Sequence, residues 1–145
     1  MQNLFKLLCL FCVSSCLTSA FAGDRVIIQC TDTGRAPSFM LRVSQNDTLR
    51  TIRVSAFKKD ERSNGFVMMK LTYDPNETLD QVTLSRPVAV GSAQRYTGGG
   101  SGSTVQLLYG MGPQTSGQGV LSKFSVFDMV TKKLVVDLQL ICRKL

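Results

Sequence analysis

Apolar and polar residues alternate along most of the chain from residue 25 onward. In the clearest stretch one face carries Leu134, Val136, Leu138, Leu140 and Cys142. A period of two predicts half-buried β-strands, and clusters of Gly, Pro, Asn and Asp mark the turns between them. Strands are predicted at residues 25–31, 38–44, 48–58, 66–73, 81–85, 104–109, 120–128 and 134–143.

The first 22 residues follow a different pattern. Lys6 precedes a short apolar run, and Ala20-Phe21-Ala22 forms a small-residue cleavage signature. This arrangement is typical of a secretory signal peptide. We therefore expect residues 1–22 to be removed and residues 23–145 to form one domain that is secreted or periplasmic.

Cys16 gives this leader a second interpretation. Val13-Ser14-Ser15-Cys16 resembles a bacterial lipobox, in which the cysteine is acylated and becomes the new N-terminus. Cleavage after Ala22 is favoured, with Cys16 serving as apolar filler of the leader. No apolar run after residue 22 approaches the roughly 20 residues that span a bilayer, so we expect no transmembrane segment in the mature chain.

Two cysteines follow the leader, Cys30 in the first predicted strand and Cys142 in the last. In an oxidising compartment they are expected to form one disulfide. Because bridged Cα atoms lie within about 7 Å, the disulfide suits a sheet whose two ends meet. About eight short strands without an amphipathic helix then predict an all-β fold, a single small antiparallel barrel. A sandwich with adjacent terminal strands satisfies the same condition.

The chain contains no histidine. It therefore lacks the commonest general base near neutral pH and the commonest metal ligand, and a disulfide between Cys30 and Cys142 removes their thiolates as well. Its carboxylate pairs and glycine-rich segments match no calcium loop or phosphate loop. We expect a binding protein rather than an enzyme, with no cofactor and no metal.

Basic residues outnumber acidic ones by 17 to 10, which gives a formal net charge of +7 and favours anionic partners. The candidate anionic-ligand face lies on the second and third predicted strands and comprises Arg42, Arg50, Arg53, Lys58 and Lys59. An anionic envelope or extracellular polymer suits such a face. Nucleic acid is not expected, because the leader directs the chain out of the cytosol and aromatic residues able to stack on bases are scarce here.

Glycine is concentrated in residues 98–103 and 110–119, on either side of one predicted strand. Backbone this rich in glycine can approach a partner closely. We expect both segments to lie at one end of the barrel. Residues 92–99 and 110–119 are the predicted contact surface.

The segment Gly91-Ser92-Ala93-Gln94-Arg95-Tyr96-Thr97-Gly98-Gly99 resembles part of the C-type lysozyme inhibitors of the bacterial envelope. Members of that family are small secreted or lipid-anchored β-barrels with one cysteine in an early strand and another near the C-terminus. The resemblance implies that Ser92 enters the lysozyme cleft and that Arg95 and Tyr96 match the Arg-Tyr pair that follows. Where the family has an aromatic strand ending in Lys-Gly, this chain has Leu107-Leu108-Tyr109-Gly110.

The resemblance implies a non-catalytic inhibitor of a lysozyme-type cell-wall hydrolase, since a hydroxyl can hydrogen-bond a catalytic carboxylate and a cation can pair with it. Two alternatives stay open. One is binding of an anionic polymer by the cationic strand face. The other is a lipocalin-like barrel that encloses a small apolar ligand, with Phe66, Met68 and Met69 lining the cavity.

Overall fold

The computed structural model describes residues 23–71, 80–99, 102–112 and 119–145. Within these ranges the regular secondary structure consists of β-strands alone. The strands are β1 (Arg25–Asp32), β2 (Phe39–Asn46), β3 (Thr51–Lys59), β4 (Phe66–Met68), β5 (Gln81–Leu84), β6 (Val88–Val90), β7 (Ala93–Gly99), β8 (Ser103–Tyr109), β9 (Val120–Asp128) and β10 (Lys133–Lys144). The predicted signal peptide, with Cys16, lies outside the described residues.

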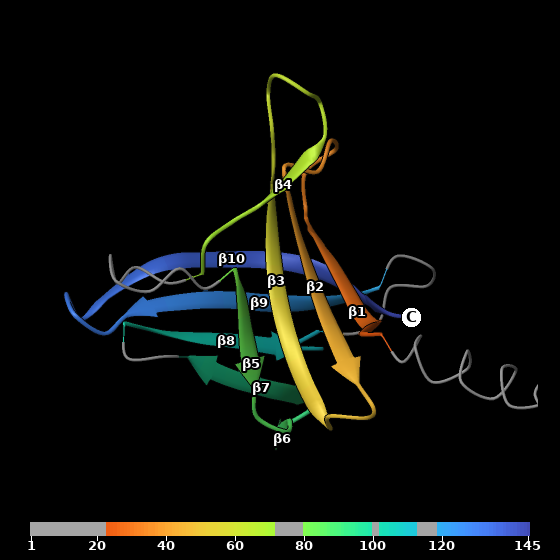
Figure 1. The fold of residues 1–145 in the computed structure, drawn as a ribbon, viewed down its shortest axis with the longest axis vertical. Helices are drawn as coiled ribbons and strands as arrows, with labels where there is room; N and C mark the ends of the chain where they lie inside the picture. Colours follow the sequence, from red (N-terminus) through yellow and green to blue (C-terminus); the bar gives the residue numbers. More distant parts are fainter. Residues whose placement is uncertain (1–22, 72–79, 100–101, 113–118) are drawn as a thin grey trace, which may run out of the picture.

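Eight of these strands close into an antiparallel barrel, which confirms the predicted fold. The order β2-β1-β10-β9-β8-β7-β5-β3 is completed by pairing of β2 with β3, so the sheet returns to its start. The two short strands are additions, β4 beside β3 and β6 beside β7. Figure 1 shows β1, β2, β3 and β5 crossing in front of β7 to β10.

The predicted disulfide is also confirmed. Cys30 and Cys142 face each other directly in the register between β1 and β10, and their sulfur atoms are bonded. Both side chains are fully buried. The link therefore joins the first and last strands inside the barrel, 112 residues apart in sequence.

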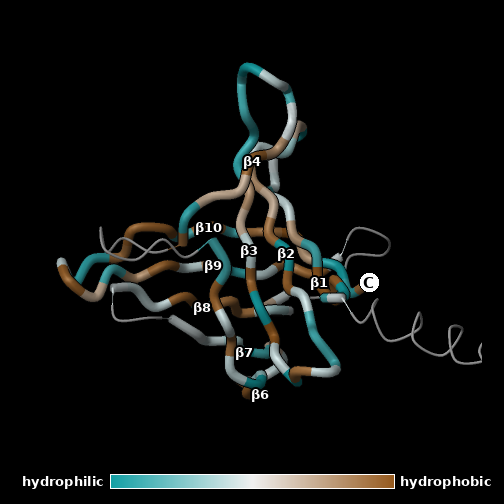
Figure 2. Tube along the Cα trace, in the orientation of Figure 1, coloured by the Kyte–Doolittle hydropathy of each residue, from teal (hydrophilic) through white to brown (hydrophobic). Residues whose placement is uncertain are grey.

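Alternation places the apolar side chains inside the barrel. β9 switches between partly buried and buried at successive positions from Leu121 to Asp128, and Phe124 packs against Phe39 with ring centroids 6.0 Å apart. Figure 2 shows the same alternation of hydrophobic and hydrophilic residues along β3. Side chains from all eight barrel strands fill the interior.

The observed strands differ from the predicted ones in two places. Ala93–Gly99 forms β7, a full barrel strand, although its glycines suggested a loop. Phe66 begins only a three-residue strand outside the barrel, while residues 72–79 lie outside the described residues. Phe66 and Met68 are 40% and 45% exposed, so they do not line an enclosed cavity as the lipocalin-like alternative required.

The glycine-rich segments lie at opposite ends of the barrel, not at one end as predicted. Gly98 and Gly99 end β7, whereas Gly110 follows the end of β8. Because β7 and β8 are antiparallel neighbours, the connections before and after β8 must lie one strand length apart. Residues 100–101 and 113–118 are outside the described residues.

Three hairpin turns share one design, an Asn or Asp followed four residues later by a left-handed residue. The turns begin at Asn46, Asp60 and Asp128, and the left-handed residues are Arg50, Asn64 and Lys132, with φ of 53°, 55° and 57°. Each initial side chain accepts a backbone N–H from the turn, as Asp128 does from Val130 at 2.9 Å. Such side-chain acceptors fix turn geometry and hence strand register.

These carboxylates make stability depend on acid pH. Hydrogen bonds from Thr131 hold the pKa of Asp128 below its ordinary value of 3.8. For Asp32, partial burial opposes ionisation, but the hydrogen bonds from Ser38 outweigh it and the pKa is again lowered. A carboxyl group whose pKa is lower in the folded than in the unfolded protein stabilises the fold at pH values above its unfolded-state pKa. This stabilisation is lost as the pH falls through the folded-state pKa.

We therefore expect the melting temperature to fall as pH drops below 3.8, and Asp128→Asn to flatten part of that fall. The amide keeps an oxygen acceptor for Val130 but does not titrate. Calorimetric melting curves between neutral pH and pH 2 measure the effect. Asp80→Asn, at an exposed aspartate, serves as the control. An identical pH dependence in parent and Asp128→Asn would contradict this assignment.

Candidate functional site

The two ends of the barrel carry different loops. One end holds the turn between β6 and β7, the connection from β8 to β9 and the end of β10, and we call it the Ser92 end. The opposite end holds the start of β2, the turn between β3 and β4 and the start of β10, and we call it the Phe39 end. The sequence-predicted contact residues lie around the Ser92 end.

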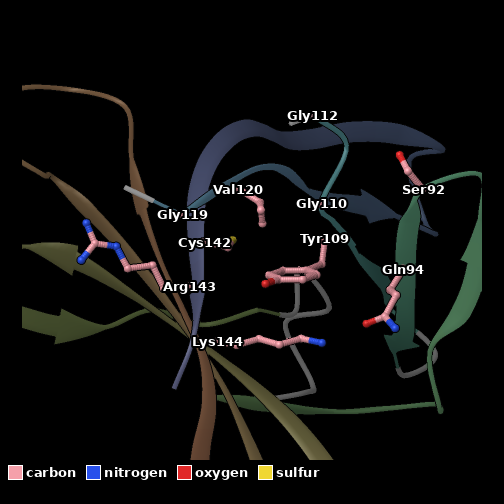
Figure 3. A pocket seen from close by; sticks show the side chains of 10 residues that line it. All are labelled: Ser92, Gln94, Tyr109, Gly110, Gly112, Gly119, Val120, Cys142, Arg143 and Lys144. Carbon is pink, nitrogen blue, oxygen red and sulfur yellow. The ribbon is translucent and has the colours of Figure 1, made fainter. Parts of the chain in front are cut away.

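A pocket of ≈ 680 Å³ opens at the Ser92 end. Its wall combines residues from four strands and one turn with glycine backbone, namely Ser92, Gln94, Tyr109, Gly110, Gly112, Gly119, Val120, Cys142, Arg143 and Lys144. Figure 3 shows Lys144 extending below the Tyr109 ring, with Gln94 across from it. Cys142, which is bonded to Cys30, is one of the lining residues, so the pocket lies beside the disulfide.

Tyr109 and Lys144 provide the chemistry of this pocket. The Lys144 Nζ atom lies 5.4 Å from the centroid of the Tyr109 ring, within the range of a cation–π contact. Burial raises the pKa of Tyr109, so its hydroxyl remains a hydrogen-bond donor at neutral pH. The pocket therefore offers a cation and a phenol hydroxyl beside the hydroxyl of Ser92 and the amide of Gln94.

Gly110 and Met111, the first residues after β8, are held beside the Ser92 turn. Ser122, which is buried, accepts a hydrogen bond from the Gly110 N–H at 3.1 Å, and the Met111 N–H donates to the Leu121 carbonyl. A Cβ on Gly110 would lie 4.0 Å from the Ser92 carbonyl oxygen. The structure thus brings the first residue of the predicted segment 92–99 beside the first residue of the segment 110–119, whereas Gly98 and Gly99 lie at the opposite end.

The hairpin formed by β6 and β7 presents Ser92 at its tip. Gly91 has a φ of 60° and, with Ser92, makes the two-residue turn. Val88 pairs with Arg95 and Val90 with Ala93, so Arg95 lies on the same face as the two valines. Val88 is 55% and Val90 41% exposed. The outer face of this hairpin therefore presents two exposed valines beside the Arg95 guanidinium.

The three predicted partner-binding residues have different surroundings. Ser92 and Arg95 are exposed, but Arg95 occupies the outer face of β7 whereas Ser92 lines the pocket. Tyr96 points into the barrel and is 4% exposed. Burial, followed by the neighbouring Tyr109, raises the pKa of Tyr96. Tyr96 is placed to support the hairpin rather than to contact a partner.

The predicted cationic set is divided among separate surfaces. On the outer face, the Arg42 guanidinium stacks 5.2 Å from the Phe57 ring, and Arg53 forms an ion pair of 3.7 Å with Asp24. Arg50 lies at the Ser92 end, where it lines a second pocket of ≈ 330 Å³ with Arg86. Lys58 and Lys59 lie at the Phe39 end. One continuous cationic face is not formed.

Sequence reasoning missed Tyr109, Lys144 and Arg86 as site residues. Alternation predicted a strand around Tyr109 but carried no information about which terminal residues meet at the barrel mouth. Lys144 reaches the pocket only because β10 continues past Cys142 in register with Ile28. The one sequence signal for the position of Lys144 was the cysteine pair, because it predicts that β1 and β10 are neighbouring strands.

The described residues contain no group of three or more Cys, Asp or Glu side chains arranged to hold a metal ion. None of their elements is a helix long and apolar enough to cross a membrane.

A scan against protein-family models finds no match, and searches of the curated proteins and of the solved structures find no significant one.

Proposed function

We propose that this chain is a non-catalytic, secreted or periplasmic binding protein that inhibits a lysozyme-type cell-wall hydrolase. In this proposal the tip of the hairpin formed by β6 and β7 enters the catalytic cleft of the hydrolase. Ser92 supplies a hydroxyl to a catalytic carboxylate, and Arg95 contacts the rim of the cleft. The observation that carries the proposal is the exposed hairpin face, where Val88 and Val90 flank Arg95 behind the Ser92 turn.

Exposed apolar residues next to an arginine are typical of a protein-binding surface. Arginine is enriched at interface hot spots, and apolar neighbours exclude water around it. Arg95 also faces Leu108 in the register with β8, which extends the apolar surroundings beyond the hairpin. A partner that covers Val88 and Leu108 would desolvate the guanidinium and strengthen its pairing with a carboxylate.

Lys144 adds a second cation at the same end. The strand ending at Tyr109 lacks the lysine that the inhibitor family carries there, but the Lys144 side chain extends beneath the Tyr109 ring (Figure 3). Lys144 and the Ser92 hydroxyl therefore border one pocket, and Arg95 lies on the outer face of the adjoining strand β7. The catalytic carboxylates of a glycoside hydrolase are matching partners for this arrangement.

Replacing Arg95 by alanine is expected to weaken inhibition at least tenfold without lowering the melting temperature. Arg95 makes no ion pair with any described residue, so its removal costs the fold little, whereas loss of one charged contact in a desolvated interface costs about 1.4 kcal/mol or more, a factor of ten. Inhibition constants from a lysozyme activity assay measure the change. Arg35→Ala removes an equal charge from an exposed loop at the Phe39 end and is the matched control.

Equal inhibition by Arg95→Ala and parent protein would rule out the proposed role of the hairpin. The anionic-polymer alternative makes a different prediction for the same variants. Binding carried by Arg50 and Arg86 should fall steeply between low and physiological ionic strength and be insensitive to Arg95→Ala. A cleft-inserting hairpin should lose less affinity with salt, because its contacts are buried.

A further inference from the structure

We propose that the Phe39 end of the barrel carries a binding site for a single-chain anionic amphiphile, with its apolar tail in a groove and its head group at Lys58 and Lys59. The site is separate from the hairpin of the proposed function, and it lies outside the packed interior of the barrel. A groove of ≈ 880 Å³ marks it, within the usual range for small-molecule sites.

The walls of the groove are apolar where the barrel opens. Phe39 and Met69 form one side, and Val135, Val136 and Leu138 of β10 form the other. β1 pairs with β10 only from Leu140 onward, so the earlier part of β10 stands clear of β1 and leaves this side open. Val135, the extra residue of a β-bulge, is 44% exposed and adds apolar surface to this wall.

Polar side chains gather at one rim of the groove, on the hairpin formed by β3 and β4. Lys58 and Lys59 lie there beside Glu61 and Asn64. Neither lysine has an ion-pair partner among the described residues. The lining holds two lysines and three carboxylates, Asp32, Glu61 and Asp137, but both lysines are free to pair with an anionic head group.

The other two carboxylates in the groove are already satisfied. Asp32 accepts from the Ser38 N–H at 3.0 Å and from its hydroxyl at 2.7 Å. Asp137 pairs with the Lys123 Nζ atom at 3.1 Å and accepts from Ser125. The two unpaired lysines and the apolar side chains of the wall thus offer contacts to a molecule with one anionic end and one hydrocarbon tail.

Titration calorimetry of the purified, disulfide-bonded protein with dodecanoate, octanoate and dodecylamine tests the site. We expect dodecanoate to bind with one-to-one stoichiometry and octanoate at least tenfold more weakly, because each buried methylene contributes about 0.8 kcal/mol, roughly fourfold in affinity. Dodecylamine should bind at least tenfold more weakly than dodecanoate, because its head group carries the wrong charge.

Two variants locate the binding on the groove. Lys58→Glu combined with Lys59→Glu should weaken dodecanoate binding at least tenfold, and Val135→Glu should do the same by placing a like charge in the wall. Leu49→Glu, at an exposed leucine in the turn between β2 and β3 at the other end, is the control and should bind as the parent does. Unchanged melting temperatures establish that each variant is folded.

Absence of dodecanoate binding would overturn the proposal, as would equal affinity for dodecanoate and dodecylamine. Binding that survives both groove variants would place the amphiphile elsewhere and overturn the assignment too. Because hydrolase inhibition depends on Arg95 at the opposite end, the lysine variants should inhibit as the parent does. Failure of one proposal therefore leaves the other standing.

Discussion

Removal of the disulfide is expected to lower the free energy of unfolding by roughly 4 to 5 kcal/mol. A bond between residues 112 positions apart restricts nearly the whole unfolded chain, and the chain-entropy relation gives this magnitude for a loop of that length. Small domains have total stabilities of about 5–15 kcal/mol. The protein without its disulfide should therefore be marginal at 37 °C.

The measurement is urea unfolding of the parent and of the variant that combines Cys30→Ala with Cys142→Ala. Alanine avoids an unpaired hydroxyl in the fully buried space that the cysteines occupy. Chemical reduction of the parent is a second route to the same state. A loss below about 1 kcal/mol in both experiments would contradict the view that the bond stabilises the barrel by constraining the unfolded chain.

Gly98→Ala is expected to cost at least about 3 kcal/mol, at the upper end of the range for overpacking. A Cβ at this position would fall on the Thr83 carbonyl oxygen and would lie 3.1 Å from Leu84 Cδ2. Gly98 and Leu84 are the one register pair between β5 and β7 among the described residues. The clash therefore occurs where β5 and β7 share a single register pair, and the backbones of these two strands must move apart to relieve it.

Denaturant unfolding of Gly98→Ala measures this cost, with Gly65→Ala as the control. A Cβ on Gly65 would make only an ordinary contact, 3.5 Å from the Ser63 hydroxyl oxygen. Gly98→Ala with the stability of the parent would show that β5 and β7 do not need this close approach. Near-parental stability of Gly65→Ala is expected, because that turn has room for a methyl group.

Glycine explains why the barrel was predictable in outline but not strand by strand. Four of the five residues that the alternation placed on one face, Val136, Leu138, Leu140 and Cys142, lie in the core or pack against it, whereas Leu134 before the β-bulge is exposed. Gly98 and Gly99 concealed β7, because local composition favours a loop, whereas the tertiary fold requires a residue without a side chain beside Thr83 and Ser103. The close approach of β5 is a long-range property that no local pattern contains.

The site was predictable to a smaller extent. Ser92 and Arg95 were proposed from a short motif, and both are exposed on the hairpin of β6 and β7. Tyr96, from the same motif, is buried because side chains alternate along β7. Tyr109 and Lys144 meet only through the register of four neighbouring strands, which depends on the whole barrel.

The most direct test of the proposed function is titration of the purified, disulfide-bonded protein into a lysozyme activity assay at physiological salt. Inhibition that saturates at one inhibitor per enzyme, and that weakens at least tenfold on Arg95→Ala, is the predicted result. Full lysozyme activity at a large molar excess of the protein would contradict the proposal that the hairpin enters the cleft of that enzyme.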